Sequence, residues 1–200
     1  MYLYGASGHC KVIIDILKKN KIKIESIFDD NESINKIFEF SVVKFNNQNI
    51  SGELLISIGN NAVRKQLVNE LKHKSYGKAI DPKAIISSNS TIKEGTVVMA
   101  NAIINTSAEV GKHCIVNSAA VVEHDCKLDN FVHVSPSVTI CGGVQIGEGT
   151  HIGAGTTIIP NIKIGKWCTI GAGSVVIKDV SDGVTVVGNP AKEIKINSEK

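Results

Sequence analysis

The sequence has no long apolar stretch. Although 42% of its 200 residues are hydrophobic, no segment approaches the ~20 apolar residues that a membrane-spanning helix needs. The N-terminal segment MYLYGASGHCKVII also lacks the basic start and small-residue cleavage site of a secretory signal, because the polar GASGH interrupts the apolar run. We therefore expect a protein that does not insert into membranes and that works in the cytoplasm.

The sequence also lacks a large excess of charge of one sign and a pairing pattern among its cysteines. The 22 Lys and Arg residues stand against 19 Asp and Glu, a net charge of +3, and no segment carries the dense basic stripe of a nucleic-acid-binding protein. The five cysteines include no C-x-x-C pair and no disulfide spacing. The composition thus argues against a nucleic-acid partner and against a disulfide framework.

What the sequence does have is a period of six residues. From Ile86 to Val176 every sixth residue is Ile, Val or Leu. The residue two positions before each of these is small or aliphatic and never charged, while the residues that follow are rich in Gly, Asn, Ser and Asp. This pattern is typical of a hexapeptide parallel β-helix, in which about 18 residues close one triangular coil. The run predicts about five coils, stacked at the ~4.8 Å spacing of strands.

Residues 1–80 follow a different pattern, in which short apolar runs alternate with helical ones. The pattern predicts strands over 2–4, 24–28 and 53–58, and helices over 10–19 and 62–72. Such alternation favours a parallel sheet and a Rossmann-like α/β fold. We therefore expect two domains, an α/β unit over 1–80 and an all-β helix with a closing segment over 81–200.

A glycine turn, GASGH, joins the first predicted strand to the first helix. A turn of this kind presents backbone N–H groups and the positive end of a helix to an anion such as phosphate. Asp29 follows Gly8 at about the 20-residue distance at which an acidic side chain binds ribose hydroxyls. Because the motif is G-x-x-G-H and not G-x-G-x-x-G, a plain strand-to-helix turn is the alternative.

Six segments together resemble a known family. They are YGASGH, FDD, IGNNAVRK, VVEHDC, FVHVSP and GNPAK. They resemble the bacterial sugar O-acyltransferase group that includes the sialic acid O-acetyltransferases, and most closely its UDP-4-amino-sugar N-acetyltransferases. The resemblance implies a left-handed β-helix that binds acetyl-CoA, an N-terminal unit that binds the nucleotide-sugar, and no metal. It also implies a homotrimer with active sites between neighbouring helices.

The segment VVEHDC supplies the candidate base. Counted from Val122, His124 and Asp125 lie at a corner of the β-helix, with Gly142 one coil above and Thr106 one coil below. Imidazole has the pKa best suited to accept a proton from an attacking amine near neutrality, and a neighbouring carboxylate orients and stabilises it. The family pattern places the base at His124, with Asp125 raising its basicity. A surface histidine without a role, next to a turn-forming Asp, is the alternative.

The resemblance also implies the binding residues. Acetyl-CoA contacts are expected at His133, Gly142, Ala154, Pro190 and Lys192. Diphosphate contacts are expected at Ser7, Gly8 and His9, nucleoside contacts at Asp29 and Asp30, and an opposite wall at Gly59, Asn60 and Arg64. A solvated helix position is the alternative for Arg64, and a solvated tail for Lys192.

Other activities stay open from the sequence. His133 and His151, one coil apart, could hold zinc as in trimeric β-helix carbonic anhydrases, although the histidine spacing does not reproduce that ligand set. A sialic acid-type O-acetyltransferase, a non-catalytic nucleotide-sugar scaffold and an acetyl-cysteine route through Cys141 are further alternatives. For assembly, we expect outward-facing Val97, Ile115 and Val121 to form apolar flats through which the chain associates.

Overall fold

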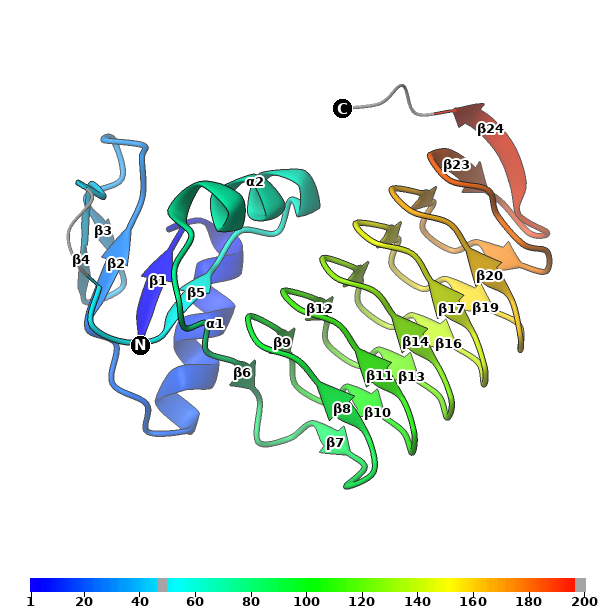
Figure 1. The fold of residues 1–200 in the computed structure, drawn as a ribbon, viewed down its shortest axis with the longest axis horizontal. Helices are drawn as coiled ribbons and strands as arrows, with labels where there is room; N and C mark the ends of the chain where they lie inside the picture. Colours follow the sequence, from blue (N-terminus) through cyan, green and yellow to red (C-terminus); the bar gives the residue numbers. More distant parts are fainter. Residues whose placement is uncertain (47–49, 197–200) are drawn as a thin grey trace.

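The computed structural model describes residues 1–46 and 50–196 of the chain (Figure 1). An N-terminal α/β unit is followed by a parallel β-helix whose coils run toward the C-terminus, which confirms the predicted fold class. Among the described residues, neither α-helix is long and apolar enough to cross a membrane.

The N-terminal unit is built on a five-stranded sheet. Its strands are β1 (Tyr2–Tyr4), β2 (Ser26–Phe28), β3 (Lys36–Ile37), β4 (Phe40–Val43) and β5 (Leu54–Ile56), in the order β3-β4-β2-β1-β5. The pairs of β1 with β2 and β5, and of β2 with β4, are parallel as predicted. The antiparallel hairpin β3–β4 was not predicted, because its strands are too short to give an alternating pattern.

Two helices cover opposite faces of this sheet. The helices are α1 (Gly8–Lys19) and α2 (Asn61–Leu71), close to the predicted ranges. Since neighbouring strand residues point to opposite faces, Leu3 and Ile27 pack in one core with α1, and Tyr4 and Phe28 in another with Leu67 of α2. The amphipathic pattern of the sequence thus sets the layers.

Three parallel sheets form the faces of the β-helix. The covered face, against which the N-terminal unit packs, contains β6 (Ala79–Ile80), β9 (Val97–Val98), β12 (Ile115–Val116), β15 (His133–Val134), β18 (His151–Ile152), β21 (Thr169–Ile170), β23 (Val184–Val187) and the antiparallel β24 (Lys192–Ile196). The uncharged face contains β7 (Ile85–Ile86), β10 (Ile103–Ile104), β13 (Val121–Val122), β16 (Thr139–Ile140), β19 (Thr157–Ile158) and β22 (Val175–Val176). The charged face contains β8 (Thr91–Ile92), β11 (Glu109–Val110), β14 (Lys127–Leu128), β17 (Gln145–Ile146) and β20 (Lys163–Ile164).

The strand register confirms the predicted coil. Val122 pairs with Ile140, and Ile140 with Ile158, so equivalent positions recur one coil apart along each face. The inward residues of the hexads form one continuous core from Val98 to Val186. Cys114, Cys126 and Cys168 belong to that core, as expected from their hexad position.

The sequence pattern predicts small or polar residues such as Gly, Asn, Ser and Asp at the corners, and the structure confirms this only in part. Gly95 and Gly143 adopt the expected left-handed backbone, with φ of +72°. His113, Phe131 and Trp167 adopt it too, with φ of +54°, +61° and +54°, although side chains there normally cost free energy. Ring packing accompanies that strain, since the rings of His113 and Phe131 stack at 5.2 Å.

Helix α1 lies between its own sheet and the covered face of the β-helix. Val97, Met99 and Ile115 share one core with Leu3 and Ile13. The prediction that Val97 and Ile115 form an exposed flat is therefore wrong, because the N-terminal unit covers them. Next to the predicted domain boundary, β6 pairs with β9 of the β-helix.

Arg64 of α2 joins the two domains. Its side chain is 1% exposed, and it donates hydrogen bonds to the carbonyls of His113 (2.8 Å), Phe131 (3.2 Å), Ile58 (2.9 Å) and Gly59 (3.1 Å). A fifth bond reaches the Asn61 side chain at 2.8 Å. Burial lowers the pKa of Arg64 to about 10, so it stays charged at neutral pH. Neither the predicted substrate wall nor the solvated alternative holds for Arg64, because its donors are used between the domains.

Replacement of Arg64 tests its role in stability. Arg64→Met should lower the free energy of unfolding by roughly 3 kcal/mol, because buried carbonyl groups lose their donors. Asn69→Ala, at an exposed position of the same helix, is the control and should change it by less than about 0.5 kcal/mol. Denaturant unfolding measures both, and equal stability of the two variants would contradict the assignment.

Candidate active site

His124 and Asp125 form a hydrogen-bonded pair at the corner between β13 and β14. The Nδ1 atom of His124 lies 2.8 Å from Oδ2 of Asp125, and the side chains are 56% and 65% exposed. This hydrogen bond, followed by the charges of Asp125 and Glu123, raises the pKa of His124 above its usual value. With Nδ1 engaged by the carboxylate, Nε2 is the ring atom left to exchange a proton with a substrate.

Gly142 leaves room above the imidazole ring. A Cβ atom added at Gly142 would lie 2.6 Å from Cε1 and 2.7 Å from Nε2 of His124. The N–H of Gly143 donates to the His124 carbonyl at 3.0 Å, and that of Asp125 to the Thr106 carbonyl at 3.2 Å. These bonds confirm the predicted coil neighbours. The absence of a side chain at Gly142 keeps Nε2 accessible.

Glu123 has a role that the sequence did not reveal. Its Oε2 atom accepts from the Asn105 side chain at 2.9 Å and from the His124 N–H at 3.3 Å. The carboxylate therefore holds the backbone next to the base and is not a solvated corner residue. The 18-residue distance between Asn105 and Glu123, one coil, was the signal that could have paired them.

The predicted substrate-binding segments converge at one edge of the N-terminal sheet. GASGH follows β1, Asp29 and Asp30 follow β2, and residues 58–60 follow β5, so all lie at the carboxyl ends of neighbouring parallel strands. β2 and β5 flank β1 on either side, and the helices that follow β1 and β5 lie on opposite faces of the sheet. This edge is therefore a topological switch point, where α/β sheets bind ligands.

The N-terminus of α1 lies open at this edge. Ser7, its N-cap, makes no side-chain capping bond, and the first turn contains no acidic residue. Ser7 and Gly8 are exposed, and a Cβ atom added at Gly8 would meet no atom within 4 Å. The first turn of the helix therefore places no acidic side chain of its own at its positive end.

The two aspartates are engaged within the fold. Asp29 accepts from the N–H of Ala6 at 2.7 Å and from that of Asn31 at 2.8 Å. Asp30 accepts from the Tyr4 hydroxyl at 2.8 and 2.9 Å. Asp29 thus fixes the glycine turn, and its role as a nucleoside contact stays a prediction.

Three histidines lie where the N-terminal unit meets the covered face. The rings of His133 and His151 stack at 4.9 Å, as expected for neighbours one coil apart. The Gly59 carbonyl lies 3.3 Å from His133 Nδ1, and the Ser135 hydroxyl 2.9 Å from His151 Nε2. Burial, with added repulsion from His151, Arg64 and His9, lowers the pKa of His133 to about 3. His133 therefore remains neutral and faces the N-terminal unit.

His9 is the third of these histidines. Its Nε2 atom is buried and has no hydrogen-bond partner among the described residues. Burial, followed by the charge of Arg64, lowers its pKa to about 4, so the ring is neutral at physiological pH. A buried ring nitrogen without a partner at the edge of the glycine turn is suited to a hydrogen bond with a ligand.

His124 and the glycine turn of one chain lie on opposite sides of the β-helix. Helix α2 contacts the corners between the charged and covered faces, through Arg64 with His113 and Phe131 and through Asn61 with Gly149 (3.0 Å). The corner between β13 and β14 joins the other edge of the charged face to the uncharged face, away from α2 (Figure 1). One chain alone does not bring the predicted base and substrate site together.

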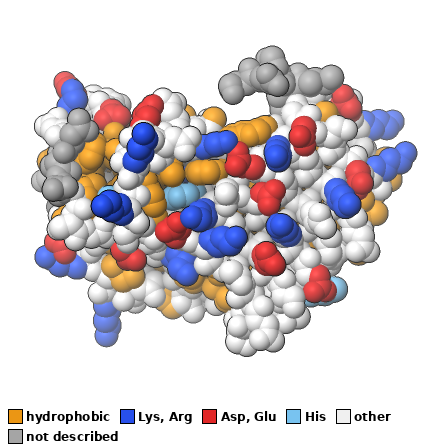
Figure 2. Space-filling model, in the orientation of Figure 1, with side chains coloured by type: hydrophobic (Ala, Val, Ile, Leu, Met, Phe, Trp, Pro, Cys, Tyr) orange, Lys and Arg blue, Asp and Glu red, His pale blue; other side chains and the backbone are white. Residues whose placement is uncertain are grey.

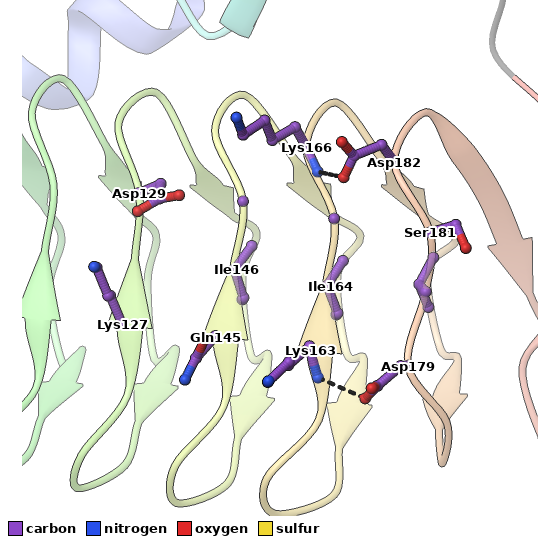
Figure 3. A pocket seen from close by; sticks show the side chains of 13 residues that line it. Lys127, Asp129, Gln145, Ile146, Lys163, Ile164, Lys166, Asp179, Ser181 and Asp182 are labelled. Carbon is purple, nitrogen blue, oxygen red and sulfur yellow. Dashed lines mark hydrogen bonds between the residues drawn. The ribbon is translucent and has the colours of Figure 1, made fainter.

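The charged face carries a shallow groove that is distinct from the corner of His124 and from the glycine turn. The groove has a volume of about 410 Å³ and is lined by Lys127, Gln145, Lys163, Lys166, Asp179, Asp182 and neighbouring residues (Figure 3). Asp179 and Asp182 accept from the backbone N–H groups of Lys163 and Lys166, each at 2.8 Å. Figure 2 shows basic and acidic side chains interspersed on the visible surface, without a field of one sign.

Comparison with known proteins finds a matching family for each domain and relatives that match the whole chain. Residues 1–71 match the family described as PglD N-terminal domain, and residues 119–159 and 143–178 match bacterial transferase hexapeptide repeats. PerB from Caulobacter crescentus, solved with CoA and GDP-perosamine, superposes with a TM-score of 0.91 and 32% identity, over 97% of this chain and 96% of that one. The chain belongs to the hexapeptide-repeat sugar N-acetyltransferases.

Two further relatives agree with this assignment. The acetyltransferase domain of PglB from Neisseria gonorrhoeae FA1090, solved with acetyl coenzyme A, has a TM-score of 0.89 and 33% identity over 96% of this chain and 98% of that one. UDP-N-acetylbacillosamine N-acetyltransferase of Bacillus subtilis (strain 168) is 39% identical over 111 residues, which span 49% of this chain and 50% of that protein.

The remaining predicted residues of this N-acetyltransferase are spread over two corners. Gly142 lies beside His124, whereas exposed Ala154 lies between the covered and uncharged faces, on the coil of His151. Pro190 and Lys192 are exposed in the closing segment at the end of the covered face. The stacked histidines belong to no group of three or more possible metal ligands in the described part of the chain.

The space above His124 yields a direct test. Gly142→Ala should lower kcat at least about tenfold, because the added methyl group displaces the ring from the position that exposes Nε2. Gly155→Ala is the control for a loss of stability alone, because its Cβ atom would meet nothing within 4 Å while its φ of +67° strains the backbone; it should lower the unfolding temperature and leave kcat unchanged. Steady-state kinetics and thermal unfolding measure both variants, and unchanged kcat in Gly142→Ala would contradict this geometry.

Proposed function

We propose that this protein transfers the acetyl group of acetyl-CoA to the amine of a nucleotide-linked 4-amino-4-deoxy sugar, with UDP as the preferred nucleotide, for surface glycan or glycoprotein synthesis. The observation that carries the proposal is the accessible His124–Asp125 pair in a chain whose N-terminal unit leaves an anion site open. The substrates named for PerB and the B. subtilis relative support a nucleotide-linked amino sugar. The reaction takes place in the cytoplasm, where both co-substrates are made.

In the proposed mechanism His124 is the general base. The sugar nitrogen attacks the thioester carbonyl while Nε2 accepts a proton from it, and Asp125 stabilises the resulting imidazolium. Backbone N–H groups stabilise the oxyanion of the tetrahedral intermediate. Collapse of this intermediate breaks the C–S bond and releases CoA as a thiolate, which receives the proton from His124. No metal is required for any step.

The nucleotide-sugar occupies the carboxyl edge of the N-terminal sheet. Backbone N–H groups of Ser7 and Gly8 at the start of α1 bind the diphosphate, where the helix end favours negative charge. The free Nε2 atom of His9 donates to or accepts from the same ligand. Gly59 and Asn60 form the opposite wall, next to the neutral ring of His133.

The active site is shared between chains. Because His124 lies away from the N-terminal unit of its own chain, a neighbouring chain has to supply the nucleotide-sugar. The uncharged face suits such an interface, since its outward residues are Ile85, Ile103, Val121, Thr139, Thr157 and Val175. The charged face presents Glu109, Lys127 and Lys163 in the equivalent positions. We infer a homotrimer that packs through the uncharged face and contains acetyl-CoA between chains.

Substitution of the pair tests the mechanism. His124→Ala should lower kcat by roughly 10²–10⁴-fold, the usual contribution of a general base, with little change in acetyl-CoA affinity. Because His124 acts as a neutral base and Asp125 raises its pKa, wild-type activity rises as pH passes a midpoint above the ordinary histidine value. In Asp125→Asn that midpoint should move to lower pH, together with a smaller maximal rate. An unshifted pH profile of kcat/KM would contradict the role of Asp125.

Nucleotide binding tests the substrate class. Gly8→Asp should abolish binding of UDP, because a carboxylate would occupy the phosphate site, whereas folding should be unaffected since the Cβ position is empty. Gly8→Ala adds a Cβ without charge and is the matched control. Calorimetry with UDP and GDP measures the effect. Absence of binding of either nucleotide to the wild type at millimolar concentration, with acetyl-CoA still bound, would instead favour an O-acetyltransferase of free sugars.

Assembly is tested on the uncharged face. Light scattering should give the wild type a mass near three times 21.4 kDa. Val121→Glu should dissociate the trimer, because it places charges in the centre of the apolar interface. Lys127→Glu changes an exposed residue on the charged face of the same coil, and it should remain trimeric. A monomeric wild type would remove the basis for a shared site.

A further inference from the structure

The corner that carries His124 continues toward the C-terminus as an apolar track. The strands that follow β13 along the uncharged face are β16, β19 and β22. Before Lys178, the first two residues of the corresponding corners are Cys141, Gly142, Ile159, Pro160 and Ile177, all of them half-buried or exposed. Ile177 is 42% exposed. The track therefore offers a solvent-accessible surface without charged side chains, beginning directly above the base.

Lys178 stands at the end of this track. The last corner consists of Ile177, Lys178 and Asp179. It is short, because Val180 already pairs with Ile164 of β20. Lys178 is exposed, and its ammonium group forms no ion pair with a described residue. The neighbouring Asp179 instead accepts from the backbone N–H of Lys163 at 2.8 Å. An available cation thus lies where the apolar surface stops.

Toward the N-terminus, the same corner has neither an apolar track nor an available cation. Below His124 the corner residues are Asn105 and Thr106, followed by Ser87 and Ser88. These side chains are polar, and none is cationic. A ligand with an apolar arm and an anionic end therefore fits only toward the C-terminus.

The length of the track matches the coenzyme. Lys178 lies three coils beyond His124, or ~14 Å at ~4.8 Å per coil. The pantetheine arm has about 13 bonds between its sulfur and the first phosphorus, and its extended reach is roughly 15 Å at the rise per bond of an extended chain. A thioester beside His124 would therefore place the diphosphate near Lys178.

We propose that Lys178 binds the diphosphate of acetyl-CoA and so fixes the position of the thioester at His124. The assignment rests on the proposed function, because it takes acetyl-CoA as the acyl donor. Pairing of an ammonium group with phosphate oxygens is a charge-assisted hydrogen bond, which is stronger than a neutral one. Lys192, the coenzyme contact expected from the sequence, lies on β24 over the covered face and not on this track.

Kinetics with two acyl donors, acetyl-CoA and S-acetyl-pantetheine, distinguish diphosphate binding by Lys178 from a purely structural role. Lys178→Ala should raise the KM for acetyl-CoA about tenfold or more with kcat nearly unchanged, the loss expected for one such bond. With S-acetyl-pantetheine, which has no diphosphate, wild type and Lys178→Ala should have the same KM. Lys178→Arg should restore most of the acetyl-CoA affinity. Lys166→Ala removes an equal charge from the charged face in the penultimate coil and should behave as wild type.

Calorimetry with CoA alone gives a second measurement that needs no sugar substrate. Lys178→Ala should weaken CoA binding by the same factor as KM and leave pantetheine binding unchanged. Equal CoA affinity in wild type and Lys178→Ala, or an equal loss with both acyl donors, would overturn the assignment. Failure of the proposed function is a different result, in which wild-type protein binds CoA but transfers no acetyl group to any nucleotide-linked amino sugar.

Discussion

The packing of one aliphatic side chain per hexad along the axis of the β-helix is the constraint on which the rest of the structure depends. It keeps every coil at the same length over most of the helix, so residues 18 apart stand above one another on each face and corner. The aliphatic position of each hexad tolerates almost no polar substitution, since an unpaired polar group in this core costs free energy. Chemical diversity is therefore confined to the corners and outward positions, where His124, Asp125 and Gly142 occur.

The second constraint is the fixed attachment of the N-terminal unit. Arg64 supplies every one of its donors to carbonyl or amide oxygens across or beside the domain junction, and α1 is buried between its sheet and the covered face. This junction has little freedom to swing the glycine turn around the prism toward His124. The separation of the predicted base and the predicted substrate site within one chain therefore follows from the fold, and the proposed association through the uncharged face would bring the two together between chains.

The repeating part of the fold was predictable from the sequence because its period is strict and its core positions are chemically uniform. The register alone placed Gly142 over His124 and His133 below His151. The contacts between domains were not predictable in this way. Arg64 looks like a solvated or substrate-facing residue in a helix, and only the folded chain shows His113 and Phe131 carbonyls converging on it. Val97 and Ile115 read as exposed apolar residues for the same reason, because the sequence does not say which face another domain covers.

The most direct measurement of the shared active site combines two inactive chains. His124→Ala lacks the base but has an intact glycine turn, whereas Gly8→Asp has the base but no phosphate site. If base and substrate site come from neighbouring chains, random co-assembly of the two in equal amounts should restore about a quarter of the wild-type activity, because one interface in four then pairs two intact halves. Activity no greater than that of the separate variants, in trimers shown to contain both chains, would contradict the account.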